Sequence, residues 1–392
     1  MQRISTADPN FLYTQDGRLF RQLVDAPLIQ FALSKLFTQL MELKFIPEHK
    51  HIGNNVYEVQ QIKRITYPPE WNVLQMLEAT KLICNINILL LESKSEILLC
   101  DMHTHNAVFD KTHPYYVDVG SFSRPYMGPG PMMKSFYDEL DWYATEFKIP
   151  GLVQIPRIKT IPTVREWHAI ISWLDHINAD VWVQANQWDN YDKSPSPEIV
   201  ADVICTSKEQ SKIMGWIKSL KPKDAIDVGC NKGIYSRLTA KEGIDVWGFD
   251  VSHKAILKAY KDNKKLQLPV AYVILDVLHP VNKGFAAKFG GRPNVSEWPQ
   301  RVRSDLVLAS SIGHHLAIGG FSLKEQAALY NLISKRYLIV EFVGPKDRGI
   351  ANWKFPTPYN LDVFYSSLSG WTKLDEFDDL DYPSRKFCLY RK

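Results

Sequence analysis

The segment Ala225-Ile-Asp-Val-Gly-Cys-Asn-Lys-Gly-Ile-Tyr-Ser236 is the most informative part of this sequence for its fold class. Its apolar start is typical of a buried strand, and the turn with Gly229 and Gly233 leads into a helical pattern. A second apolar segment, Val246 to Asp250, ends in an acid 21 residues after Gly229. This layout predicts a nucleotide-type cofactor site at the first strand-to-helix turn of a doubly wound α/β sheet.

The downstream sequence repeats the alternation of strand and helix. Apolar strands are expected at 271–276, 305–310 and 336–342, with helices at 252–263 and 323–334. Near-continuous apolar strands that alternate with helices predict a mostly parallel sheet with both faces covered. Two further strands are expected within 371–391, around Asp381-Tyr-Pro-Ser384, as a terminal antiparallel hairpin.

The spacing Asp-x-Gly-x-Asn-x-Gly at 227–233 resembles motif I of class I S-adenosyl-L-methionine-dependent methyltransferases. Asn231 stands where that motif usually has its middle glycine, and Asn tolerates the left-handed backbone that such a turn needs. A terminal antiparallel hairpin also closes the sheet in that family. The resemblance covers about residues 205 to 392 and implies a Rossmann-like methyltransferase domain with S-adenosyl-L-methionine as cofactor.

The same resemblance implies a set of cofactor contacts. Asp250 is expected to accept hydrogen bonds from the ribose hydroxyls, and Asp276 from the adenine amino group, with the Val277 amide facing a ring nitrogen. Asp227 is expected to orient the methionine end; for each acid the alternative is a residue that caps a loop. The predicted cofactor-binding residues are Asp227, Gly229, Cys230, Asn231, Gly233, Asp250, Val251, Asp276, Val277, Ser310, Trp188 and Tyr191.

Three smaller predictions concern chemistry at this site. His314 or His315, just past the fourth strand, is the candidate general base, because histidine titrates near neutrality; the alternative is that both rings pack and hold the loop. Cys230 is expected to be a small packed residue in the turn and not a nucleophile. Trp188 and Tyr191 either cover the cofactor, with cation–π stabilisation of the sulfonium, or form an aromatic lid on the sheet.

The first 150 residues carry a different pattern. Asp101, Asn106 and the Asp-x-Gly at Asp118 match the catalytic loop and metal-binding strand of protein kinases. No glycine-rich phosphate loop precedes them, and Arg21 stands where a lysine is expected. The sequence therefore predicts a degenerate kinase-like α+β module; an active small-molecule kinase is the alternative.

Several stretches resemble the NoeA-like methyltransferase family, which is named from a rhizobial nodulation protein. They are 65–71, 74–79, 101–106, 117–122, 314–316 and 341–343. This resemblance spans most of the chain and leaves the acceptor open. The loop at 101–106 has His103 and His105 where the family more often has Thr and Tyr. No metal site is predicted, because no Cys or carboxylate grouping supports these histidines.

Composition is consistent with a two-domain globular protein. The chain has 392 residues, of which 45% are hydrophobic, and a net charge of +4. The expected organisation is a kinase-like domain at 1–150, a helical and aromatic connector at 151–204, and the methyltransferase domain at 205–392. No apolar run approaches 18 residues and no signal sequence is evident, which predicts a cytoplasmic protein without a membrane span. Five widely spaced cysteines predict buried thiols without disulfides.

The functional prediction is a methyltransferase that methylates oxygen or nitrogen of a small-molecule or glycan-like acceptor. A mild basic excess in the second half fits an anionic acceptor, and the absence of a continuous basic stripe with interleaved aromatics argues against nucleic acid. The alternatives are a non-catalytic protein that retains the cofactor pocket and a bifunctional kinase–methyltransferase. The oligomeric state is left open by the sequence.

Overall fold

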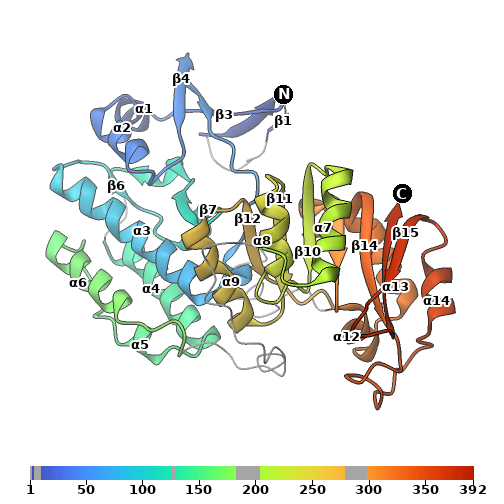
Figure 1. The fold of residues 1–392 in the computed structure, drawn as a ribbon. Helices are drawn as coiled ribbons and strands as arrows, with labels where there is room; N and C mark the ends of the chain where they lie inside the picture. The colour runs from blue at the N-terminus through green and yellow to red at the C-terminus, as the bar shows by residue number, and fades with distance from the viewer. Residues whose placement is uncertain (1, 4–9, 126–128, 182–203, 279–297) are drawn as a thin grey trace. The chain divides into compact units, whose positions relative to one another are not determined.

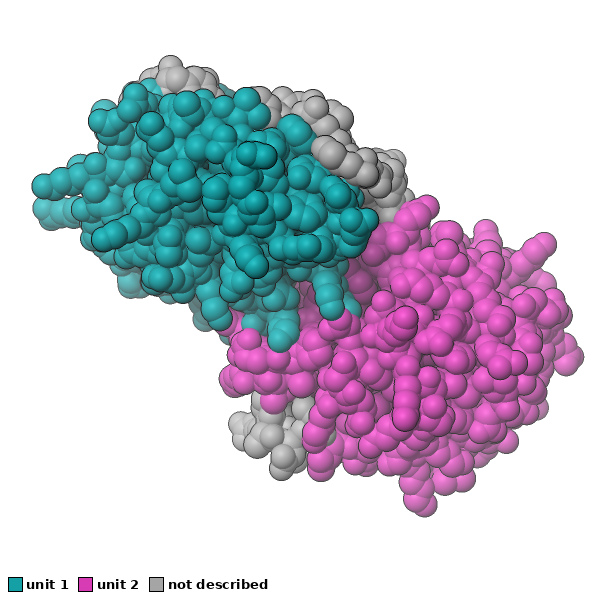
Figure 2. All heavy atoms as spheres, turned by 90° about the horizontal axis from the view of Figure 1, so that it is seen from above, with its two compact units in different colours: residues 1–184 teal, residues 185–392 magenta. Residues whose placement is uncertain are grey.

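The computed structural model describes residues 2–3, 10–125, 129–181, 204–278 and 298–392. The chain divides into two compact units, Met1–Gln184 and Ala185–Lys392 (Figure 2). Helices that lie between residues 151 and 181 belong to the first unit. The expected division at residues 150 and 204 remains a prediction, because its second boundary adjoins residues 182–203, which are outside the described part.

The first unit begins with a five-stranded antiparallel sheet of order β1-β2-β3-β5-β4 (Figure 1). Its strands are β1 (Gln2–Arg3), β2 (Leu12–Gln15), β3 (Arg18–Gln22), β4 (His49–Gly53) and β5 (Val56–Val59). Helices α1 (Ala26–Ala32) and α2 (Lys35–Glu42) lie between β3 and β4 in sequence. Asp16 and Gly17 join β2 to β3 with φ of 51° and 73°, as an Asp-Gly hairpin turn requires.

Helix α3 (Val73–Glu92) is the main helix of this unit. It is one continuous helix that follows Asn72. The Asn72 side chain accepts from the N–H groups of Leu74 and Gln75, which fixes the start of the helix. Among the described residues, this is the one helix long and apolar enough to cross a membrane, and most of it is buried within the unit, as core helices of globular proteins are.

Two short hairpin-like pairings follow α3. Strand β6 (Leu98–Leu99) pairs with β9 (Phe122–Ser123), and β7 (Ala107–Asp110) pairs with β8 (His113–Tyr116). Helices α4 (Pro129–Glu146), α5 (Pro150–Val153) and α6 (Val164–Asp175) complete the unit. These pairings bring the chain around residue 101 and the chain around residue 118 to the same place.

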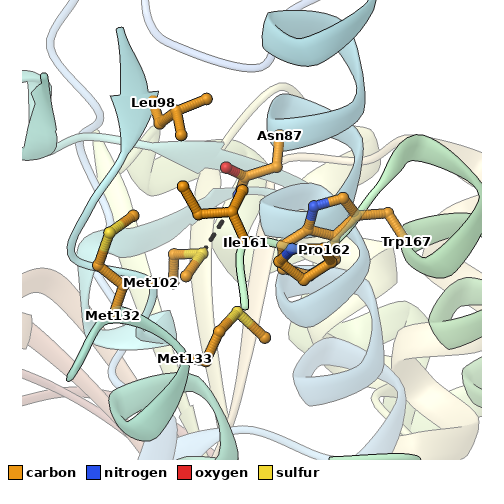
Figure 3. Close-up of a pocket in the computed structure, with 8 residues that line it drawn as sticks. All are labelled: Asn87, Leu98, Met102, Met132, Met133, Ile161, Pro162 and Trp167. Carbon is orange, nitrogen blue, oxygen red and sulfur yellow. Dashed lines mark hydrogen bonds between the residues drawn. The ribbon is translucent and has the colours of Figure 1, made fainter. Parts of the chain in front are cut away.

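A small apolar pocket lies in the core of the first unit (Figure 3). Met102, Met132, Met133 and Trp167 contribute to its lining, and the Asn87 side-chain amide donates to the Met102 sulfur at 3.4 Å. The flexible methionines surround a gap between α3, α4 and α6 that the neighbouring side chains do not fill. We regard it as a packing feature of this core.

The second unit is built on a seven-stranded sheet of order β12-β11-β10-β13-β14-β16-β15. Its strands are β10 (Asp224–Val228), β11 (Asp245–Asp250), β12 (Val270–Ile274), β13 (Ser304–Ala309), β14 (Ser334–Val343), β15 (Thr372–Asp378) and β16 (Arg385–Arg391). The first five strands in chain order are parallel, whereas β16 pairs antiparallel with both β14 and β15. The α/β prediction for this part of the chain, including the terminal hairpin, is confirmed.

Helices cover both faces of this sheet, and each face has its own hydrophobic core. Helices α7 (Lys208–Leu220), α8 (Ile234–Lys241) and α9 (His253–Leu266) pack on one face. Helices α11 (Trp298–Val302), α12 (Gly313–Ile318), α13 (Leu323–Ile333) and α14 (Leu361–Ser367) pack on the other. In β10, Ile226 and Val228 point to the second face and Ala225 to the first, which explains why the strand is apolar throughout.

All five cysteines are free thiols, and four of them are buried while Cys205 is partly exposed. The prediction of unpaired thiols is therefore confirmed. The order of the strands reverses between β10 and β13, so the carboxyl ends of these two strands border the point where open α/β sheets bind ligands.

Candidate active site

The turn after β10 adopts three left-handed backbone conformations. Gly229, Asn231 and Gly233 have φ of 72°, 49° and 75°. Asn is one of the few residues with a side chain that enters this region at low cost, which explains how Asn231 can stand where a glycine is usual. The Cys230 N–H donates to the Phe249 carbonyl at 2.8 Å and so ties the turn to β11.

The two glycines are required by their neighbours as well as by their backbone angles. A Cβ on Gly233 would meet the Tyr272 ring, and a Cβ on Gly229 would lie 2.8 Å from the Ile312 side chain. Ile312 belongs to the turn after β13. The turn after β10 and the turn after β13 are therefore in van der Waals contact, with room for a glycine and for nothing larger.

Asp250 links the end of β11 to the glycine turn. Its Oδ2 accepts from the Asn231 N–H and its Oδ1 from the Ser252 N–H, both at 2.8 Å. Two apolar side chains beside these residues, Ile234 and Val251, are each 39% exposed. An acid with two accepting oxygens next to exposed apolar side chains suits a ribose attached to an aromatic base.

Asp227 lies inside the sheet at the other side of the turn. It is buried, and Ser236 donates its hydroxyl to Oδ2 at 2.5 Å. Burial raises the pKa of Asp227 to about 6, and the hydrogen bonds from Ser236 oppose that rise. Burial also raises the pKa of the Cys230 thiol well above its usual range, so this sulfur stays protonated and is a poor nucleophile, in line with its expected packing role.

Asp276 and Val277 follow β12. The Asp276 Oδ1 accepts from the Leu278 N–H at 2.9 Å, and Val277 packs on the sheet core. The loop-capping alternative is thus observed for Asp276. A contact of this acid with adenine stays a prediction.

Ser310 stands at the carboxyl end of β13, and its hydroxyl donates to Glu341 Oε2 at 2.8 Å. Glu341 is 3% exposed and belongs to β14. No role for this acid was predicted from the sequence, although a charged residue inside an otherwise apolar strand was a usable signal. Buried carboxylates require partners, and here the turn after β13 supplies them.

His314 and His315 lie in the first turn of α12, with ring centroids 4.0 Å apart and ring planes tilted by 40°. Trp353 lies 5.6 Å from the first ring and 5.5 Å from the second. Burial, followed by the neighbouring imidazole, lowers the pKa of His314 to about 3, and burial lowers the pKa of His315 to about 4. Both rings are neutral near pH 7. This packing matches the alternative in which the histidines hold the loop.

The sequence-predicted residues thus fall into three groups. The glycine turn, Asp250 and Ser310 gather at the carboxyl edge of β10, β11 and β13, and Ile312 joins the histidine-bearing helix to that turn. Asp276 follows the next strand, β12. Trp188 and Tyr191 lie outside the described residues.

The first unit holds a second polar cluster, at Asp101. Its Oδ1 forms an ion pair with His103 Nε2 at 3.0 Å, and its Oδ2 accepts from the Asn106 amide at 3.3 Å. Burial alone would raise the pKa of Asp101, but the bonds from His103 and Asn106 keep this pKa below its usual range. Asp118 accepts from the Gly120 N–H at 3.1 Å and from the Ser121 hydroxyl at 2.6 Å.

Arg21 reaches the same cluster from β3. It is 3% exposed and donates to the Val117 carbonyl, next to Asp118, at 2.9 Å. The residues that sequence spacing associated are therefore brought together in space. The three histidines of this region have separate partners: His103 pairs with Asp101, His105 with Glu139 at 2.9 Å, and His113 with the Lys44 carbonyl at 2.9 Å.

Comparison with known proteins gives one relative by sequence. The chain is 22% identical over 437 aligned positions to nodulation protein NoeA of Rhizobium meliloti (strain 1021), a match that covers 90% of this chain and 87% of that protein. NoeA is a homologue of this chain. The resemblance to NoeA-like proteins is therefore confirmed over nearly the whole length. No family model matches the chain.

Solved structures with some likeness include several methyltransferases. Magnesium protoporphyrin IX methyltransferase of Synechocystis PCC 6803 with bound SAM is 16% identical, with 52% of this chain and 89% of that chain covered and a TM-score of 0.34. A putative O-methyltransferase of Nostoc punctiforme PCC 73102 is 12% identical, with 55% and 63% covered and a TM-score of 0.38. The bifunctional kinase-methyltransferase WbdD is 15% identical, with 50% and 42% covered and a TM-score of 0.35. These TM-scores are too low to carry an argument about function.

Proposed function

We propose that the second unit is an S-adenosylmethionine-dependent methyltransferase domain, and that the protein methylates an oxygen or nitrogen of a small-molecule or glycan-like acceptor. The observation that carries the proposal is the joint geometry of the glycine turn and Asp250. Asp250 holds the Asn231 N–H, and the turn comes too close to Tyr272 and Ile312 for any Cβ at the two glycines. Such a turn lets a ligand approach the backbone, and the acid beside it suits ribose hydroxyls.

In the proposed reaction the acceptor atom attacks the methyl carbon in line with the sulfur. The new bond to carbon forms as the carbon–sulfur bond breaks, and the acceptor loses a proton. The cofactor supplies the activated methyl group. The protein contributes mainly proximity and alignment, worth roughly 7–11 kcal/mol at best. Here Asp250 would hold the ribose and Asp227 would orient the methionine end. The contact of Ile312 with Gly229 would hold the turn after β13, on the acceptor side, at a fixed distance from the cofactor turn.

The proton of the acceptor needs a destination. His314 or His315 is the base that we propose, because the helix that carries them starts at the turn in contact with Gly229. Their low pKa values leave both rings neutral and able to accept a proton, but weakly. The imidazolium formed in this way would pass the proton on to water and so return to the neutral ring, and the base is therefore ready at all pH values above about 5.

The acceptor side carries exposed positive charge. Lys346, Arg348 and Lys354 are exposed on the segment that follows β14, whereas Asp347 in that segment is buried and bound to Arg385. Trp353 of the same segment lies against the two histidines. These features support an anionic small-molecule or glycan-like acceptor. A cytoplasmic location also remains part of the proposal.

Turnover tests this function directly. The purified protein is incubated with S-adenosylmethionine and a panel of anionic sugars and small hydroxyl or amine compounds, and S-adenosylhomocysteine is measured. Acceptor-dependent release that Asp250→Ala abolishes is the expected result. Cofactor binding with no release on any acceptor would favour the alternative, a regulatory protein that retains the pocket.

The polar cluster of the first unit favours a second candidate, a kinase-like module that makes the protein bifunctional. The Asn106 amide bonds to Asp101, and Ser121 links that amide to Asp118. The three side chains thus lie together, as phosphoryl transfer requires of a base and two magnesium ligands. Asp101 is engaged by His103, and Arg21 takes the place of the expected lysine, which supports a degenerate module. Magnesium-dependent ATP binding that Asp118→Ala removes is expected if nucleotide binding persists; its absence in the wild type would contradict this candidate.

A further inference from the structure

Glu341 is a buried carboxylate with an unusual set of partners. It lies in β14 between the apolar Val340 and Phe342. Its Oε2 accepts three hydrogen bonds, from the Ser310 hydroxyl at 2.8 Å, the Ser311 N–H at 2.7 Å and the Ser311 hydroxyl at 2.8 Å. Its Oε1 is buried without a hydrogen bond, 3.7 Å from an Arg385 nitrogen. All of its hydrogen bonds thus converge on one two-residue turn.

The turn that Glu341 holds is strained. Ser311 has φ of +53°, in the left-handed region that residues with a side chain rarely enter. Both the backbone N–H and the hydroxyl of Ser311 bond to the same carboxylate oxygen. A conformation of this kind persists where its surroundings fix it, and the carboxylate of Glu341 is the group that does so.

The strained turn adjoins both the cofactor turn and the helix that carries the proposed base. Ile312, the next residue, lies against Gly229 of the cofactor turn. His314 follows two residues after Ile312, in the first turn of α12, the helix of the proposed base. A shift of the Ser310–Ser311 turn would therefore move the cofactor turn and the histidines together.

Stability alone gives no reason for an acid here. An apolar side chain would satisfy a strand between Val340 and Phe342 without the desolvation of a charge. Arg385 does not require Glu341 either, because it donates to Asp347 at 2.7 Å. Burial raises the pKa of Glu341, while Arg385 and the two serines oppose that rise.

We propose that Glu341 is a positioning residue, which fixes the Ser310–Ser311 turn and thereby sets the cofactor turn against the acceptor-side helix. This inference rests on the proposed methyltransferase function and adds to it a residue that touches neither cofactor nor acceptor. It predicts that the loss of Glu341 acts on ligand binding through the backbone of Ser311.

A substitution series with a matched control tests the inference. Glu341→Ala removes the acceptor, and Glu341→Gln keeps an oxygen that can accept from both serines. Asp305→Ala is the control: Asp305 is also buried, lies at the opposite end of β13, and accepts from the Lys223 N–H at 2.9 Å. We expect Glu341→Ala to weaken S-adenosylmethionine binding about tenfold or more, and the other two to stay within about threefold of wild type.

A backbone rescue makes the test specific. Glycine enters the left-handed region at no steric cost, so Ser311→Gly added to Glu341→Ala should restore most of the lost affinity. A general loss of stability would not be restored in this way. Equal binding by wild type and Glu341→Ala, or equal weakening by Asp305→Ala, overturns the inference.

Amide hydrogen exchange separates this inference from the proposed function. In Glu341→Ala, exchange should rise in residues 229–234 and 310–318, and in Asp305→Ala it should not rise there. This readout needs no ligand, so it holds even if the wild type fails to bind S-adenosylmethionine, which would contradict the proposed function alone. Unchanged exchange in both segments contradicts the positioning role.

Discussion

The backbone N–H of Asn231 donates to Oδ2 of Asp250 at 2.8 Å. This one hydrogen bond joins the turn after β10 to the end of β11, the two places where a nucleoside cofactor has to be held. The acid is therefore oriented by the protein before any ligand arrives, which lowers the ordering cost of binding.

Gly233→Ala should strongly destabilise the second unit. An alanine at position 233 would keep an unfavourable φ of +75°, and its Cβ would meet the Tyr272 ring. We expect a loss of about 2–4 kcal/mol in the free energy of unfolding, measured by urea denaturation. Gly243→Ala is the control, because Gly243 has nearly the same φ, +77°, with nothing within 4 Å. Its cost should be about 1 kcal/mol. Equal losses of unfolding free energy in the two variants would show that the Tyr272 contact adds nothing to the cost of the backbone angle.

Asp227 should make stability depend on pH. Its pKa is about 6 in the folded protein and 3.8 without burial, so between these values the folded state binds more protons than the unfolded state. The contribution of Asp227 to stability therefore falls as pH rises from about 4 to 6, by about 3 kcal/mol. Relative to Asp227→Asn, the wild type should lose stability over that window in urea denaturation. A constant difference between the two proteins across the window would refute this assignment.

The pKa values of the histidines should be shifted in opposite directions in the two units. Burial holds the pKa of His314 near 3 and that of His315 near 4, whereas Asp101 raises the pKa of His103 above 6.5 in spite of its burial. An NMR titration of the imidazole resonances, with each assigned by substitution to Gln, measures this. No change for His314 and His315 above pH 5, and a midpoint above 6.5 for His103, is the expected pattern. Midpoints near 6.5 for the paired rings would mean that they are exposed.

Much of the second unit follows from local sequence patterns. The five parallel strands and the terminal hairpin were predictable because each is a short apolar run between turn residues, and the left-handed backbone at Asn231 because few residue types tolerate it. The pairing of Ser310 with Glu341 was not, because it depends on the register between β13 and β14. Sequence spacing alone does not reveal which side chains face each other across two strands.

In the first unit, too, spacing predicts contacts between segments that are close in sequence and does not predict distant ones. The association of Asp101, Asn106 and Asp118 was evident from spacing, since the segments that carry them lie close in sequence. Arg21 was noted in the place of the expected lysine, but its bond to the Val117 carbonyl was not predictable, because 96 residues separate the two. The start of α3 after Asn72 carries a local signal, because an Asn followed by Gln at the third position is a capping signal.

Whether the second unit binds S-adenosylmethionine through Asp250 is measured by calorimetric titration of the purified wild type, Asp250→Ala and Asp245→Ala. Asp245 lies at the opposite end of the same strand, β11, and serves as the control. We expect wild-type binding at micromolar affinity or better, about −8 kcal/mol, that Asp250→Ala weakens at least tenfold and Asp245→Ala leaves unchanged. A folded wild type that does not bind S-adenosylmethionine would contradict the methyltransferase function, and the Asp101 cluster of the first unit would become the place to look for activity.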